Sequence, residues 1–154
     1  MIDEPQISEV AAQPAAVIRL TIPRSEIQTV MGPGLGELMA ALAAQGIAPS
    51  GPWFTHHLKM DTETFDFEIG VPVTSPVTAA GRVEPGQLPT ATVARTVYHG
   101  DFEGLGSAWA EFGAWIDTHG HTPAPDLWEV YLSGPDADPD PVTWRTELNR
   151  PLIR

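Results

Sequence analysis

Glu129 and Tyr131 are the residues whose types and spacing most directly suggest chemistry, because they stand two positions apart in the apolar stretch 127–133. This stretch is short and is followed by Gly134 and Pro135, a pattern that predicts a β-strand. Residues two apart share a face of a strand, so the carboxyl and the phenol should lie side by side. On an apolar face, such a carboxylate needs a hydrogen bond, a cation or a proton. The pair could therefore bind a cation or act in acid–base catalysis.

A simpler interpretation of the same stretch is an ordinary strand with one solvated face. Antiparallel strands often expose one face, and Glu129 and Tyr131 would then merely be in water. Trp128, Val130 and Leu132 point the other way and are typical of a core. Periodicity alone does not separate these two interpretations.

The composition limits the class of protein. The chain has 154 residues, of which 42% are hydrophobic, and it contains no cysteine. This length suggests one compact domain or two small halves, without disulfides or thiolate metal sites. The net charge of −12, from 20 acidic and 8 basic residues, argues against nucleic acid as a partner and would attract a cationic small molecule. No signal peptide or membrane span is evident, so we expect a cytoplasmic protein. We expect it to be a monomer or a homodimer, and the sequence does not distinguish the two.

Hydrophobic periodicity divides the first half of the chain into four elements after a polar lead-in at 1–14 that we expect to be flexible. The predicted elements are a strand at 15–22, a helix at 26–45, and strands at 53–60 and 64–71 joined by the short connection 61–63. Gly32-Pro33-Gly34 interrupts the helical pattern, which suggests that the helix begins nearer Pro33. Gly46 is a natural terminator.

The second half repeats this order of elements. An extra strand with a Gly turn at 79–89 is followed by a strand at 91–98, a helix at 102–119, a strand at 127–133, a Pro- and Asp-rich loop at 134–141 and a last strand at 142–148. Three residue matches support an internal repeat. They are Val17 with Val93 (an offset of 76), Trp53 with Trp128 (an offset of 75), and the segment 68–73 with 147–152 (an offset of 79).

A tandem strand–helix–strand–strand repeat predicts an α+β fold with a pseudo-two-fold axis, an antiparallel sheet and two long helices. The predicted domain is 15–152, with repeats at about 15–73 and 79–152. Two such halves would leave a central cleft, a favoured place for a ligand. By the offset of 75, Glu129 corresponds to Phe54 and Tyr131 to His56, so one half would present an acid and a phenol where the other presents an aromatic ring and an imidazole.

Several short segments resemble a known family, the GyrI-like small-molecule-binding domain. They are 88–89 leading into the strand that ends Tyr-His-Gly-Asp-Phe-Glu-Gly-Leu at 98–105, Trp-Glu-Val-Tyr-Leu at 128–132, and Thr-Glu-Leu-Asn-Arg-Pro-Leu at 146–152. The resemblance covers about 15–152 and implies the same tandem-repeat fold. Only 14 residues precede Ala15, so we expect a stand-alone member rather than a multidrug-responsive transcription activator.

The resemblance also implies a role for Glu129. In drug-sensing members, the matching acid lies in an aromatic-lined pocket and helps to recognise lipophilic cations. Some stand-alone members are hydrolases that open the cyclopropane ring of DNA-alkylating natural products, and there the matching acid takes part in catalysis. The namesake of the family docks on a topoisomerase. Any of these activities would need no cofactor.

The remaining candidates are aromatic or basic residues. Trp109 and Phe112 lie on one helical stripe and are either ordinary core or the floor of a pocket, and Tyr98 is either a pocket residue or a half-buried strand residue. His56 and His57 are adjacent and point to opposite faces of a strand, which disfavours a metal site. The predicted ligand-binding residues are Glu129, Tyr131, Phe54, His56, Trp128, Tyr98, Trp109 and Phe112.

Three hypotheses follow. The first is a binding module for apolar, aromatic and cationic compounds, with Glu129 as the counter-charge. The second is a hydrolase in which Glu129 is the general base and Tyr131 or Tyr98 the proton donor. The third is an inhibitor that docks on a topoisomerase, which an exposed apolar patch would favour. The first two need the same acid in the same apolar cleft, so the sequence does not distinguish them.

Overall fold

The structure, a computed structural model, describes residues 2–60, 63–134 and 138–153. It is an α+β fold with antiparallel strand pairs and two long helices, which confirms the predicted tandem strand–helix–strand–strand repeat. The chain divides into two compact units. We call residues 11–90 the first repeat, and residues 91–154 together with 1–10 the second repeat.

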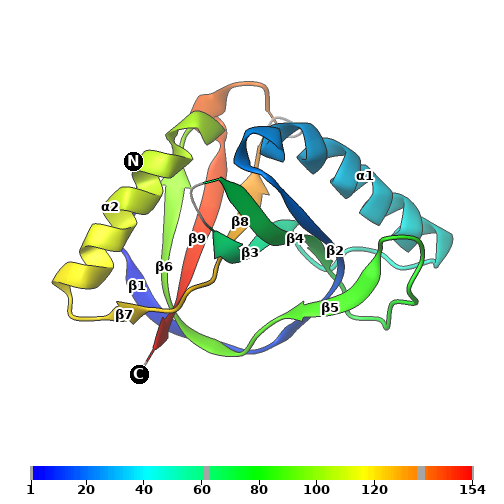
Figure 1. Cartoon of the computed structure of the whole chain (residues 1–154), viewed down its shortest axis with the longest axis horizontal. Helices are drawn as coiled ribbons and strands as arrows, with labels where there is room; N and C mark the ends of the chain where they lie inside the picture. Colours follow the sequence, from blue (N-terminus) through cyan, green and yellow to red (C-terminus); the bar gives the residue numbers. More distant parts are fainter. Residues whose placement is uncertain (1, 61–62, 135–137, 154) are drawn as a thin grey trace. The chain divides into compact units, whose positions relative to one another are not determined.

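The first repeat is a four-stranded antiparallel sheet in the order β3-β4-β2-β5 with one helix (Figure 1). Its elements are β2 (Gln13–Pro23), α1 (Ile27–Ala44), β3 (Phe54–Met60), β4 (Thr64–Pro72) and β5 (Glu84–Leu88). Alternation along β4 turns Phe67 and Ile69 toward Leu38 and Leu42 of α1, and these four side chains are at most 1% exposed. This contact is the core of the first repeat.

The helix α1 begins at Ile27, six residues before Pro33, so the predicted later start was wrong. A proline inside a helix removes one backbone hydrogen bond and costs about 3 kcal/mol. Ile27, Val30 and Met31, in the turns before it, pack against the core cluster, and this burial offsets the cost. Helices near this length draw most of their stability from such packing rather than from propensity.

The second repeat has the same strand order, with β8-β9-β6-β1 in place of β3-β4-β2-β5. Its elements are β1 (Gln6–Val10), β6 (Ala91–His99), α2 (Leu105–Thr118), β7 (Thr122–Pro123), β8 (Leu127–Ser133) and β9 (Arg145–Ile153). Phe112 and Ile116 of α2 pack on Ala94 of β6 and Leu148 of β9. The short strand β7 pairs with the end of β9 and was not predicted.

Two strand predictions in the second repeat were wrong. The lead-in predicted to be flexible contains β1, which pairs with β6 from Gln6↔Arg95 to Val10↔Ala91, because β6 offers an otherwise unpaired edge. The last strand, β9, begins at Arg145 and runs through Pro151. Pro151 lies beyond the last β8 pair, Trp128↔Asn149, so its missing N–H removes no ladder bond on that side. Parts of the predicted connections 61–63 and 134–141 lie outside the described residues.

The strand registers correct the residue matches of the repeat. The short helices before α1 and α2 begin at Arg24 and Phe102, an offset of 78, and Ala15↔Pro72 pairs as Val93↔Pro151 does. Helix α1 has 18 residues and α2 has 14, which is four fewer. The offset between equivalent residues therefore falls from 78 before the helices to 74 in the strand that follows each helix. Phe54↔Gly70 accordingly matches Trp128↔Asn149. The predicted offsets of 76 and 75 were therefore wrong, by two residues and one residue.

None of the described helices is both long enough and apolar enough to cross a bilayer.

Candidate functional site

Glu129 is buried in the second repeat, with only 8% of its surface exposed. One carboxylate oxygen accepts a hydrogen bond of 2.6 Å from Nε1 of Trp109 on α2, and the other accepts one of 2.8 Å from the hydroxyl of Tyr131. The interpretation of this strand face as solvated is therefore wrong for Glu129. The Tyr131 bond follows from the local spacing of the strand, whereas the Trp109 bond joins residues twenty positions apart.

Two opposing effects act on the ionisation of Glu129. Burial raises the pKa of its carboxyl, and the hydrogen bonds from Trp109 and Tyr131 act in the opposite direction because they favour the carboxylate. Within the described part of the chain, the ion pairs of the second repeat join Arg95 to Glu147 and His99 to Asp3, and none of them includes Glu129. The acid is thus held by two neutral donors.

Further aromatic rings pack on the two residues that contact this acid. Phe102 lies edge-on to Tyr131, with ring centroids 6.0 Å apart, and packs on Trp144 at 5.1 Å. Trp109 packs on Phe112 at 5.7 Å. Trp109, Tyr131, Phe102 and Trp144 are half-buried, so their rings border solvent, whereas Phe112 is fully buried. We call Glu129 with these four half-buried aromatic residues the acidic aromatic cluster.

Sequence reasoning missed Phe102 and Trp144. Phe102 opens the short helix before α2, where the Asp101 side chain caps it by accepting from the Gly104 N–H. Trp144 precedes β9, and its indole donates to the carbonyl of Asp138. The only sequence signal was an aromatic residue beside a predicted cap or strand end, and such residues are too common to identify a site.

Tyr98 lies on the same sheet face as Tyr131 but one strand further away. Thr146 of β9 pairs with Tyr98 on one side and with Tyr131 on the other, so a strand separates the two phenols. Tyr98 is 6% exposed and belongs to the core with Phe112, and burial raises the pKa of its hydroxyl. Its hydroxyl approaches Gly104 so closely that a Cβ there would overlap it. No contact between Tyr98 and Glu129 is found in the described structure.

Trp128 points to the opposite face of β8 from Glu129. It is in register with Asn149, which accepts from Arg95 at 2.7 Å. Trp128 is buried, whereas Leu132 on the same face is 43% exposed. That face was predicted to be plain core, and the exposure of Leu132 shows that this holds only at its beginning.

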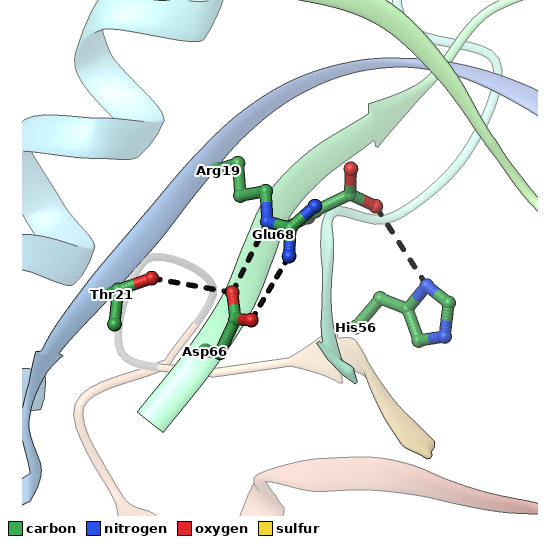
Figure 2. A network of polar contacts seen from close by, with 5 residues as sticks. All are labelled: Arg19, Thr21, His56, Asp66 and Glu68. Atoms are coloured by element: carbon green, nitrogen blue, oxygen red, sulfur yellow. Dashed lines mark hydrogen bonds and ion pairs between the residues drawn. The ribbon is translucent and has the colours of Figure 1, made fainter. Parts of the chain in front are cut away.

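Phe54 and His56 lie in the first repeat, on the face of β3 turned away from the α1 core. His56 pairs in register with Glu68, and its Nδ1 lies 3.7 Å from a Glu68 carboxylate oxygen (Figure 2). The same network contains Arg19, whose guanidinium donates to both oxygens of Asp66 at 3.1 and 2.9 Å. Phe54 and His56 are nevertheless buried, at 1% and 5% exposed, so this sheet face is not a solvated one at their positions.

The predicted equivalence of Phe54 with Glu129 and of His56 with Tyr131 was wrong. At the observed offset of 74, the equivalents are Thr55 and His57, on the other face of β3. A slip of one residue along a strand exchanges the faces, which explains the error.

The described residues do not form a cluster of metal-binding side chains. Within residues 2–60, 63–134 and 138–153, no group of three or more His, Cys, Asp or Glu side chains is placed to hold an ion.

The sequence as a whole matches a family model, that of the GyrI-like small molecule binding domain, over residues 3–152. The chain belongs to this family. The GyrI-like model spans both repeats, including β1 in the segment that was predicted to be a lead-in. No curated protein matches the sequence.

Solved structures share the fold of this GyrI-like chain. The C-terminal domain of EcmrR is 19% identical with a TM-score of 0.85, and the match covers 98% of both chains. In the EcmrR–DNA complex, the GyrI-like chain spans 57% of EcmrR. A hydrolase from Listeria innocua is 15% identical with a TM-score of 0.68, over 97% of this chain and 92% of that one. SAV2435, solved with tetraphenylphosphonium bound, is 15% identical with a TM-score of 0.67, over 98% and 94%.

Proposed function

We propose that this protein binds lipophilic aromatic cations, with Glu129 of the acidic aromatic cluster as the counter-charge. The observation that carries the proposal is a buried carboxylate held by an indole N–H and a phenol O–H, with no basic partner among the described residues. An uncompensated buried carboxylate is costly for folding, and a cationic ligand relieves that cost.

The aromatic members of the cluster suit the apolar part of such a ligand. Indole, phenol and phenyl faces attract a cation by their quadrupoles and supply large contact areas. The half-buried ring of Trp109 contacts the acid, and the half-buried rings of Phe102 and Trp144 extend this surface from Tyr131. The structure of SAV2435 with tetraphenylphosphonium shows a protein of the same fold holding a ligand of this class.

A pair of ligands matched in shape tests the proposal. Methyltriphenylphosphonium is a cation, and triphenylphosphine oxide has the same three rings without a net charge. We expect isothermal titration calorimetry to show tighter binding of the cation. In Glu129→Gln, binding of the cation should weaken by roughly 1–3 kcal/mol, the size of a lost charge-assisted contact, while binding of the oxide stays as before.

Glu111→Gln is the matched control for this test, because it removes the same charge from an exposed position of α2. It should leave both affinities unchanged. Equal weakening in Glu111→Gln and Glu129→Gln would mean that only the net charge of the protein matters, and the role of Glu129 would be refuted.

A hydrolase is the second candidate, favoured by the 2.8 Å contact between Glu129 and the Tyr131 hydroxyl. In that reaction, the Glu129 carboxylate takes a proton from water as the water oxygen attacks a cyclopropane carbon. The ring C–C bond breaks, and its electron pair is protonated, with Tyr131 as the donor. A fold relative named as a hydrolase supports testing this. Turnover of a cyclopropane-containing alkylating agent, followed by product analysis, should fall roughly 10²–10⁴-fold in Glu129→Gln if the acid is a general base.

The protein-docking alternative has less support. The exposed large apolar side chains of the described residues each lie on a different element, and they are Ile7, Met39, Leu132, Val142 and Ile153. Among the described residues, no element carries two of these exposed apolar side chains.

A further inference from the structure

The first repeat carries its own cluster of aromatic and polar residues at the position equivalent to the acidic aromatic cluster. Phe102 and Arg24 each open the short helix before the long one. The strand registers make His57 of β3 the equivalent of Tyr131 of β8, at the offset of 74. Between β4 and β9 the offset is 79, and it makes Phe65 the equivalent of Trp144, the residue before β9. The two positions are thus related by the repeat, but their chemistry differs.

The contacts in the first repeat reproduce those of the second with basic side chains. The Arg24 guanidinium carbon lies 4.4 Å from the centroid of the Phe65 ring, as Phe102 lies against Trp144. The His57 ring is edge-on to Phe65 and stacked on Phe67, with both centroid distances 5.2 Å. The equivalent of Phe102 is thus a guanidinium and that of Tyr131 an imidazole, whereas the equivalent of Glu129 is the uncharged Thr55.

One ring nitrogen of His57 lacks a hydrogen-bond partner in the described structure. It is only 6% exposed, and its Nδ1 is buried without a hydrogen-bond partner in the described structure. A buried polar atom left unpaired destabilises a fold, so such atoms call for an explanation. Burial lowers the pKa of His57 to about 4, with smaller contributions from the charges of His56 and Arg24, and the nearby Arg24 charge attracts an anion.

The Arg24 guanidinium is also placed to bind an anionic ligand. Its side chain is exposed, and the ion pairs of the first repeat in the described ranges join other residues, namely Arg19 with Asp66, His56 with Glu68 and Arg82 with Glu37. A planar guanidinium binds a carboxylate through two parallel hydrogen bonds. Phe65 is half-buried and offers an apolar ring beside this fork. A doubly charged phosphate suits the site less well, because the net charge of −12 repels it more strongly.

We propose that the first repeat holds a second binding site, formed by Arg24, His57 and Phe65, for a small aromatic carboxylate. Arg24 binds the carboxylate from the solvent side, the ligand ring packs against Phe65, and the His57 imidazole gains an acceptor. This site differs in place and in ligand charge from the acidic aromatic cluster.

Benzoate is the probe, and benzyl alcohol, which has the same ring without the charge, is its control ligand. We expect benzoate at pH 7 to shift the imidazole nuclear magnetic resonance signals of His57 in a saturable way, with millimolar affinity, and benzyl alcohol to leave them in place. His57→Phe, whose spectrum lacks the His57 signals, assigns them.

Two arginine variants locate the charge that matters. Arg24→Gln should weaken benzoate binding about tenfold, the loss expected for a hydrogen-bonded charge contact. Arg82→Gln removes the same charge from the same repeat, where Arg82 pairs with Glu37 at 2.6 Å, and should leave the affinity as it was. An unmoved His57 signal, an equal response to benzyl alcohol, or an equal loss in both variants would overturn the site. Because neither probe is a cation, failure here would leave the Glu129 proposal untouched.

Discussion

At the scale of single residues, Glu129 and His57 are buried titratable groups whose surroundings shift their pKa values in opposite directions. Burial raises the pKa of the Glu129 carboxyl and lowers that of the His57 imidazole, because in each case it disfavours the charged form. The two groups therefore contribute to pH-dependent stability with opposite signs, and single substitutions can separate them.

Glu129 should make the protein less stable as pH rises. Its folded-state pKa lies above the ordinary 4.5. At pH values between the ordinary pKa and the folded-state pKa, the folded state binds more protons than the unfolded state, so the free energy of unfolding falls as pH rises. Glu129→Gln lacks this ionisation and should gain stability relative to the unmodified protein as pH rises above 4.5. Urea unfolding from about pH 5 to about pH 8 measures the difference. A difference that does not change with pH would contradict the prediction.

His57 should make the protein less stable as pH falls. Its pKa is about 4 in the folded state against an ordinary 6.5, so the unfolded state binds more protons between these values. The stability associated with neutral His57 is complete above pH 6.5 and is lost as pH falls toward 4. His57→Phe keeps a ring against Phe67 and should remove this loss, which is of order 3 kcal/mol. Urea unfolding measures this acid sensitivity.

At the scale of elements, the approach of β6 to the start of α2 depends on a glycine. The Tyr98 hydroxyl lies where a Cβ at Gly104 would be, whereas a Cβ at Gly106, within α2, meets nothing within 4 Å. The junction of strand and helix is therefore tightly packed at one glycine and open at the other.

Gly104→Ala should destabilise the protein by about 1–3 kcal/mol through overpacking against Tyr98. Gly106→Ala should instead stabilise it by about 0.5–1 kcal/mol, since alanine is the better helix former. Thermal unfolding of both variants tests the contrast. Adding Tyr98→Phe removes the hydroxyl and should relieve part of the Gly104→Ala cost. A cost that stays the same in that background would mean that the overlap with Tyr98 is not its cause.

At the scale of the whole molecule, the net charge of −12 determines which polymers can approach. A surface with this balance repels the phosphate backbone of a duplex. We expect no binding of duplex DNA at physiological salt in a gel-shift assay, whereas EcmrR, whose C-terminal domain shares the fold, was solved with DNA. Salt-sensitive binding at micromolar protein concentrations would contradict this.

The two repeats show how one arrangement of elements serves different chemistry. Both have the same strand order and a long helix packed on the sheet, and both place aromatic rings where the short helix meets the strands. Phe102 and Tyr131 in one repeat are matched by Arg24 and His57 in the other, and Glu129 is matched by the uncharged Thr55. The fold therefore specifies where a cluster forms, and individual residues specify its charge.

The sequence by itself determined the order of elements in the two strand–helix–strand–strand repeats and the strand face shared by Glu129 and Tyr131. Alternation and helical spacing are properties of a few consecutive residues, so they can be recognised in the sequence without knowledge of the fold. Gly46, which ends the first predicted helix, adopts a φ angle of 69°, a conformation that glycine accepts readily. These features were correctly predicted because their causes are local.

Only the tertiary structure decided which side chains contact Glu129. The Trp109 hydrogen bond, the approach of Phe102 to Trp144 and the pairing of β1 with β6 all join segments distant in sequence. Such contacts depend on strand register and helix packing, which the pattern within a segment does not contain. A slip of one residue in register exchanges the two faces of a strand, and so His57, rather than His56, is the counterpart of Tyr131.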